Sequence, residues 1–142
     1  MAVLALAAGA VAALSLVYAV RRRPADARRR VYAAGLIVAA LVYVGFAAAG
    51  HAPAAWLGYE LLGVAVFGAV AWAGTRDARV LAAGWALHTV WDLVPHLGRR
   101  PGATYTPQWY PWLCVSFDLL VAGAVLGWPR WPARLAAPPD ER

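Results

Sequence analysis

The segment from Ala54 to Ala73 reads AAWLGYELLGVAVFGAVAWA, and its only charged residue is Glu60. In an α-helix a segment of this length extends about 30 Å, which matches the hydrocarbon core of a bilayer. The segment lacks the strict alternation of apolar and polar residues that is typical of a half-buried strand. Only helices and closed barrels satisfy all their backbone hydrogen bonds inside a membrane. We therefore predict a membrane-spanning helix with a carboxylate inside it.

Four further apolar runs of similar length occur at residues 2–20, 31–50, 80–97 and 109–128. Of the 142 residues, 63% are hydrophobic and only 14% are charged, whereas a soluble domain carries roughly 25% charged residues. We therefore expect an all-α, polytopic integral membrane bundle of five transmembrane helices, formed as one domain by residues 1–128 in a bacterial inner membrane. Six arginines follow the first run and no positive charge precedes it. This order is the reverse of a signal peptide, so we expect the first run to be retained.

The arginines between the runs predict the orientation of the bundle. Residues 21–30 read RRRPADARRR, and further arginines occur in the turn at 74–79 and in the tail at 129–142. In a five-span chain these three segments fall on one side, and the opposite side carries only Arg99 and Arg100. The positive-inside rule then places the N-terminus outside and the C-terminus in the cytoplasm. This distribution accounts for the net charge of +6 without a nucleic-acid partner. We expect the polar, Pro-rich end of the tail to be disordered.

Four ionisable side chains lie inside the last three apolar runs, namely Glu60, His88, Asp92 and Asp118. A carboxylate near the centre of a membrane span costs roughly 2.5–3.5 kcal/mol on insertion scales, so it is rare without a partner or a water-filled cavity. From the helical rise per residue, all four groups lie between the midplane and the outer leaflet. His88 and Asp92 are four residues apart and share a helix face. We expect one shared polar pocket among the last three spans.

Acid–base catalysis on a lipophilic substrate is the function that such a pocket favours. A carboxyl group and an imidazole can act there as general acid and general base, and isomerisation or cyclisation is the expected type of reaction. We assign catalytic roles to all four ionisable residues and substrate contacts to Trp85, Trp91, His96 and Cys114. The expected partner is a membrane lipid or a lipophilic small molecule. The residues alone leave open whether the protein is an enzyme.

A divalent metal site is the alternative, although no cofactor is predicted outright. Nitrogen and oxygen ligands together suit zinc, iron or manganese, and the candidate ligands are His88, Asp92, His96, Glu60 and Asp118. The chain has no His-x-x-x-His element, which argues against a membrane hydroxylase. A transport role would require homo-oligomers, because five spans without an internal repeat are few for a transporter. A further alternative is an accessory membrane subunit in which the acids act as polar clamps between helices.

One stretch of the sequence resembles a known family. The element Gly84–Asp92, GWALHTVWD, is followed by His96, by Cys114 and by Phe117-Asp118. This pattern is similar to a group of small bacterial membrane proteins defined only as a domain of unknown function, number six thousand and ten. The resemblance covers about residues 31–128, includes the acidic residue of the third span, and leaves out the first span and the tail. Where the family pattern implies a His-His pair, this chain has Pro95 and His96. The resemblance implies a compact polytopic protein and supplies no activity.

Overall fold

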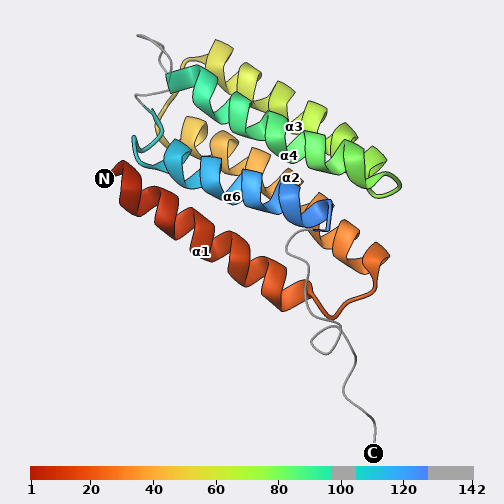
Figure 1. Cartoon of the computed structure of the whole chain (residues 1–142). Helices are drawn as coiled ribbons and strands as arrows, with labels where there is room; N and C mark the ends of the chain where they lie inside the picture. The colour runs from red at the N-terminus through yellow and green to blue at the C-terminus, as the bar shows by residue number, and fades with distance from the viewer. Residues whose placement is uncertain (97–104, 128–142) are drawn as a thin grey trace, which may run out of the picture.

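The computed structural model describes residues 1–96 and 105–127, and within these residues it contains helices and no strand (Figure 1). The α-helices occupy the apolar runs of the sequence, with differences at their ends. The elements are α1 (Ala2–Val20), α2 (Ala25–Ala49), α3 (Ala54–Gly74), α4 (Ala78–Leu93), the short 3₁₀ helix η1 (Val94–His96) and α6 (Tyr110–Val125). The expected loop at 98–108 lies largely outside the described residues, and so does the tail from residue 128.

Two of the helix ends differ from the apolar runs for clear local reasons. Helix α2 begins at Ala25 rather than at residue 31. Pro24 stands immediately before the helix, a place that proline tolerates, and the arginines at 28–30 continue the helical backbone into the apolar run. Helix α4 ends at Leu93 rather than at residue 97, and η1 contains Pro95. A proline lacks the N–H that a helix interior needs and disfavours helical geometry in the preceding residue.

Three of the described helices are long and apolar enough to cross a membrane: α1, α2 and α3, with 19, 25 and 21 residues. Helix α6 is a shorter apolar helix of 16 residues, and α4 also has 16 residues. A helix of this shorter length extends about 24 Å. Length and composition therefore identify three membrane-spanning candidates rather than the five that the apolar runs predict.

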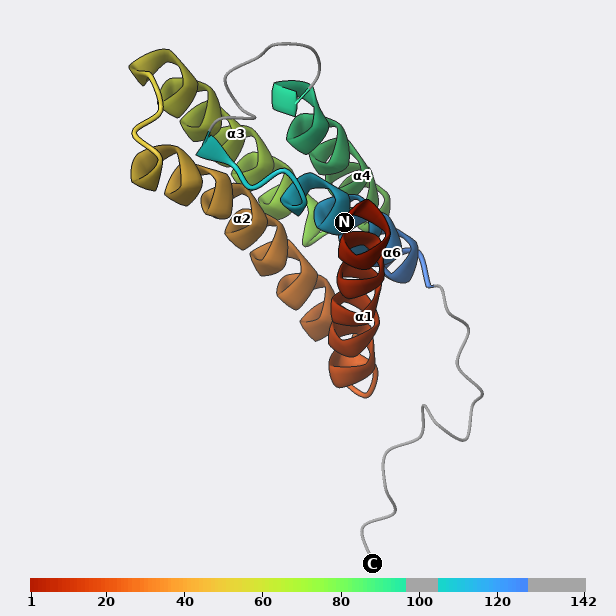
Figure 2. The same ribbon diagram turned by 90° about the vertical axis from the view of Figure 1, so that its left-hand side faces the viewer.

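The helices pack as a bundle in which α2, α3, α4 and α6 are neighbours, and α1 packs on α6 and adds Ala13, Val17 and Val20 to the buried core (Figures 1 and 2). Consecutive helices from α2 to α4 run in opposite directions, whereas α1 and α6 run in the same direction (Figure 1). The contact between α1 and α6 is close because Gly9 faces the carbonyl of Leu113 and the side chain of Ser116. The Ser116 hydroxyl donates a hydrogen bond of 2.7 Å to the carbonyl of Leu6. Helix α6 thus connects α1 to the rest of the bundle.

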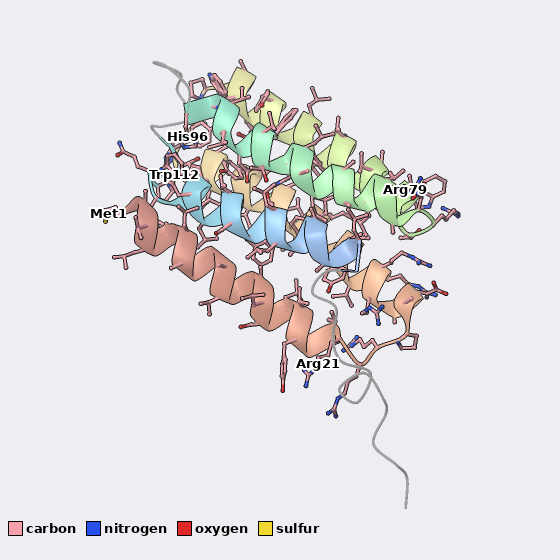
Figure 3. All side chains as sticks on the ribbon, viewed as in Figure 1. Met1, Arg21, Arg79, His96 and Trp112 are labelled. Carbon is pink, nitrogen blue, oxygen red and sulfur yellow. The ribbon has the colours of Figure 1, made fainter. Side chains whose placement is uncertain are left out.

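The two ends of the bundle have different characters. Figure 3 places Met1, His96 and Trp112 at one end and Arg21 and Arg79 at the other. The arginine-rich segment 21–30 and the turn between α3 and α4 therefore lie at the same end of the molecule. This arrangement agrees with the grouping of arginines on one side that the sequence predicts.

Candidate functional site

The centre of the candidate site is the imidazole of His88, which lies between two carboxylates. Its Nδ1 atom is 3.0 Å from Oδ2 of Asp118 on α6 and 3.3 Å from Oδ2 of Asp92 on its own helix. All three side chains are buried, with exposed fractions of 2% or less. Four-residue spacing on α4 places His88 and Asp92 on one face, and the packing of α6 against α4 supplies Asp118. One ligand-type atom from each residue lies within 4.8 Å of the others.

Hydrogen bonding in this cluster is incomplete. Nδ1 of His88 and Oδ2 of Asp118 share a hydrogen bond, and the tautomer of the imidazole decides which of them donates. Asp92 is close to the same nitrogen, yet neither of its oxygens makes an aligned hydrogen bond with a described residue. Nε2 of His88 is likewise buried without a hydrogen-bond partner there. More than nine in ten buried polar groups in proteins have a partner, so these atoms are exceptional among the described residues and mark the cluster as a candidate site.

Aromatic rings surround the imidazole. The ring of Phe67 meets His88 edge to face with centroids 4.8 Å apart, and the ring of Trp85 lies 6.4 Å away. Phe67 also contacts Trp91 at 5.7 Å, and Trp91 stacks on Tyr59 at 4.2 Å. Trp85 is 1% exposed and its indole N–H has no partner among the described residues. The surroundings of the charged groups are therefore apolar and aromatic, which strengthens electrostatic interactions.

Glu60 is buried beside this cluster but has partners of its own. The hydroxyl of Tyr105 donates a 2.8 Å hydrogen bond to Oε1, and the indole of Trp91 donates a 3.4 Å bond to Oε2. Gly63 lets the indole come close, because a Cβ at that position would lie only 2.9 Å from the Trp91 ring. Glu60 also lies close enough to Asp92 and His88 to interact with them electrostatically. The structure thus brings His88, Asp92 and Asp118 into direct contact and holds Glu60 in an adjoining site.

His96 and Cys114 both lie outside the three-residue cluster. Nδ1 of His96 lies 3.0 Å from the backbone carbonyl of Asp92, so its N–H satisfies one of the free carbonyls at the end of α4. Cys114 is a buried free thiol one turn before Asp118. The thiol lies close enough to Asp92 to interact with it electrostatically. Neither residue belongs to the group whose ligand atoms lie within 4.8 Å of one another.

The geometry of the cluster suits a metal ion as far as three ligands go. In a tetrahedral site with bonds of 2.0–2.1 Å, neighbouring ligand atoms are about 3.3 Å apart. The separations from Nδ1 of His88 to Asp92 and Asp118 are 3.3 and 3.0 Å. Of the five ligands that the sequence indicates, these three form the group that could hold an ion. Glu60 and His96 would have to exchange their present partners to join it.

Two tyrosines belong to the site although the sequence did not indicate them. Tyr43 on α2 is 1% exposed, and its hydroxyl has no hydrogen-bond partner among the described residues. This hydroxyl lies close enough to Asp92 and Glu60 to interact with them electrostatically. Tyr105 lies outside the apolar runs, and burial together with the Glu60 carboxylate raises its pKa, so it is a neutral donor at neutral pH. An uncharged tyrosine in an apolar run is a weak signal, and only the contact with Glu60 identifies Tyr105.

A family model matches most of the chain, over residues 2–128. The chain belongs to the family of unknown function DUF6010. The match is wider than residues 31–128 and includes the residues of α1, so the expectation that the first span lies outside the family is wrong. The tail beyond residue 128 is outside the match. No curated protein and no solved structure matches the chain. Family membership supplies no activity, so the chemistry has to be argued from the site.

Proposed function

We propose that this chain is a five-span integral membrane protein with its N-terminus outside and its C-terminus in the cytoplasm. Three of its helices have the required length and hydropathy. Helices α4 and α6 are shorter, but each runs between the same two ends of the bundle (Figure 1). Large apolar side chains face outward on all five helices, which suits contact with lipid; examples are Val11, Val38, Leu62, Leu87 and Leu119. The arginines at one end support the orientation.

Within this membrane protein we propose an enzyme that moves protons on a lipophilic substrate, with Nε2 of His88 as the proton-accepting atom. The observation that carries this proposal is the hydrogen bonding of the imidazole. Nδ1 is held between Asp92 and Asp118, while Nε2 is buried and has no hydrogen-bond partner in the described part of the chain. A carboxylate on one ring nitrogen orients the imidazole and makes the other nitrogen the reactive one.

The neighbouring groups have distinct proposed roles. Asp118 fixes the ring through its 3.0 Å hydrogen bond and stabilises the imidazolium that forms when Nε2 takes a proton. Asp92, whose oxygens have no aligned hydrogen bond with a described residue, supplies in its protonated form the proton that is added at the other carbon. An isomerisation needs only this pair of transfers, because a proton added at one carbon and removed from another leaves the substrate's composition unchanged. The aromatic rings around His88 suit a substrate with transient positive charge.

A metal-binding function is the second candidate, and the spacing of the ligand atoms favours it. The two proposals differ at one atom. In the proton-transfer enzyme Nδ1 of His88 carries a hydrogen and donates it to Asp118, whereas in a metal site that nitrogen is a bare ligand. A mixed set of one imidazole and two carboxylates suits zinc, iron or manganese.

Comparison of membranes from cells that produce the wild-type chain, His88→Asn or His51→Asn tests the proposed function. His51 is an exposed turn residue with a positive φ of 52°, a conformation that Asn tolerates, so His51→Asn is the matched control. Lipid extracts are separated by chromatography and weighed by mass spectrometry. We expect a lipophilic compound whose retention changes at constant mass in wild-type and His51→Asn membranes, and not in His88→Asn membranes.

Elemental analysis of the same three proteins, purified in mild detergent, separates the two candidates. Stoichiometric metal in the wild-type and control proteins, lost in His88→Asn, would replace the proton-transfer proposal with the metal site. Identical extracts from all three strains, together with protein free of metal, would contradict both proposals. The clamp role of an accessory subunit would then be the best account of the buried acids.

A further inference from the structure

A second polar feature lies at the arginine-rich end of the bundle, far along the helices from His96 and Trp112 (Figure 3). A cavity of about 70 Å³ is lined there by Arg28, Arg29 and Tyr32 of α2, together with Ala78 of α4 and Ala124 of α6. We call it the arginine cavity. It lies where the beginnings of α2 and α4 meet the end of α6. The described His88 cluster uses none of these residues.

The two guanidinium groups of the arginine cavity are held in place by backbone carbonyls. Nη1 of Arg28 donates a 2.8 Å hydrogen bond to the carbonyl of Arg23. Nε of Arg29 donates a 3.3 Å bond to the carbonyl of Thr75, and its Nη2 pairs with Asp26. Each guanidinium has five N–H donors, so both retain donors beyond these contacts. Ordered arginines with free donors are suited to bind a phosphate oxygen.

The backbone and the surrounding charges favour an anion at the same place. Helix α2 begins after Pro24 without a side-chain cap, and its first residue Ala25 lines the cavity. Uncapped N–H groups at a helix start carry partial positive charge and attract anions. The segment 21–30 holds six arginines and one aspartate. The side chains at Ala78 and Ala124 are small, which leaves room beside the guanidinium groups.

We propose that the arginine cavity binds the phosphate of an anionic phospholipid headgroup. This inference rests on the proposed membrane placement, which puts the ends of the helices at the level of the cytoplasmic headgroups, and it does not depend on the chemistry at His88. Basic pockets between membrane helices on the cytoplasmic side bind anionic headgroups. The small volume admits the phosphate and leaves the rest of the lipid on the bundle surface.

Thermal unfolding of the full-length chain in detergent tests the inference with three probes: dioctanoyl phosphatidylglycerol, dioctanoyl phosphatidylcholine and inorganic phosphate. A ligand that binds the folded protein raises the melting temperature, and a tighter ligand produces the same rise at a lower concentration. We expect phosphatidylglycerol to raise the melting temperature at a concentration at least about tenfold lower than either other probe, because two anchored arginines and the surrounding positive charge select a net-negative lipid. Equal effects of the two lipids, or of inorganic phosphate and phosphatidylglycerol, would overturn the assignment to an anionic lipid.

Two double variants with the same loss of charge locate the effect. Arg28→Gln with Arg29→Gln changes the arginine cavity, and Arg22→Gln with Arg30→Gln changes two exposed arginines of the same segment. We expect the first pair to abolish the shift by phosphatidylglycerol and the second pair to keep most of it. Equal losses would show general surface attraction and overturn the cavity site.

A third variant guards against misfolding of the double arginine variant. Ala124→Leu fills the arginine cavity from α6 and leaves every charge in place. We expect it to weaken binding of phosphatidylglycerol at least about tenfold while the protein stays folded. An unchanged shift in Ala124→Leu would overturn the proposal. The His88→Asn variant should keep the lipid-induced shift, so failure of the proton-transfer proposal and failure of this one can be told apart.

Discussion

Nδ1 of His88 lies 3.0 Å from Oδ2 of Asp118, although the two residues are 30 positions apart on different helices. Both side chains are buried in a bundle whose other contacts are largely apolar. A buried pair of this kind is weak evidence for stability, because the cost of removing two charged groups from solvent offsets their attraction. The pair therefore gains interest as a means of orienting the imidazole.

Asp118→Asn should separate orientation from stability. The amide keeps the shape of the carboxylate and can still accept from Nδ1, and it is cheaper to bury because it is neutral. Intramembrane hydrogen bonds average roughly 0.6 kcal/mol, so we expect the melting temperature in detergent to change little. We expect the change in retention at constant mass to disappear from the lipid extracts, because Asn does not stabilise an imidazolium as a carboxylate does. If the lipid extracts of Asp118→Asn show the same change in retention as those of the wild type, an electrostatic role of Asp118 is contradicted.

Gly9→Ala should disturb the contact between α1 and α6. A Cβ at Gly9 would clash with the Leu113 carbonyl and the Ser116 hydroxyl, so the helices must move apart. Overpacking of this kind costs roughly 1–3 kcal/mol. The matched control is Gly45→Ala on α2, where nothing lies within 4 Å of the added carbon. There the substitution should be neutral or stabilising, because Gly is about 1 kcal/mol worse than Ala in a helix interior.

Thermal unfolding of the two glycine variants in detergent provides the measurement. We expect Gly9→Ala to melt several degrees below the wild type and Gly45→Ala to melt at or above it. Equal melting temperatures would mean that α1 is not packed on α6 as described.

Cysteine labelling tests the proposed orientation. In a Cys114→Ala background, Asp26→Cys places a thiol in the arginine-rich segment and His51→Cys places one in the turn at the opposite end. Both positions are exposed. An impermeant reagent added to intact cells should label position 51 and leave position 26 unlabelled until the cells are opened. The reverse pattern would overturn the orientation that the positive-inside rule predicts.

The sequence predicts the helices well, because a long apolar run without strand alternation satisfies its backbone hydrogen bonds best as an α-helix. It also predicts that His88 and Asp92 are neighbours, since their four-residue spacing is a property of one helix. The relation between helices is harder to foresee. Depth alone places Glu60 in the same layer as the other acids, but the rotation of α3 depends on how Trp91 packs against Gly63. That packing turns Glu60 toward Trp91.

Contacts from outside the apolar runs were also beyond sequence reasoning. Tyr105 reaches Glu60 from a position 45 residues away, and no periodicity links the two residues. The close approach of Tyr105 to Gly50, where an added Cβ would lie 2.7 Å from the tyrosine Cβ, depends on the path of the chain after α2 and α4. Patterns within one segment carry no information on such paths.

Tyr105→Phe and Tyr43→Phe form a matched pair that tests hydrogen bonding around Glu60. Both changes remove one hydroxyl from a buried tyrosine. The Tyr105 hydroxyl donates to Glu60, so its loss leaves Oε1 of a buried acid without that donor and should cost roughly 1–3 kcal/mol. The Tyr43 hydroxyl has no partner among the described residues, so its removal should be neutral or slightly stabilising. Thermal unfolding in detergent measures both effects. If Tyr43→Phe proves as damaging as Tyr105→Phe, the Tyr43 hydroxyl has a partner outside the described residues, and the expectation that its removal is neutral is wrong.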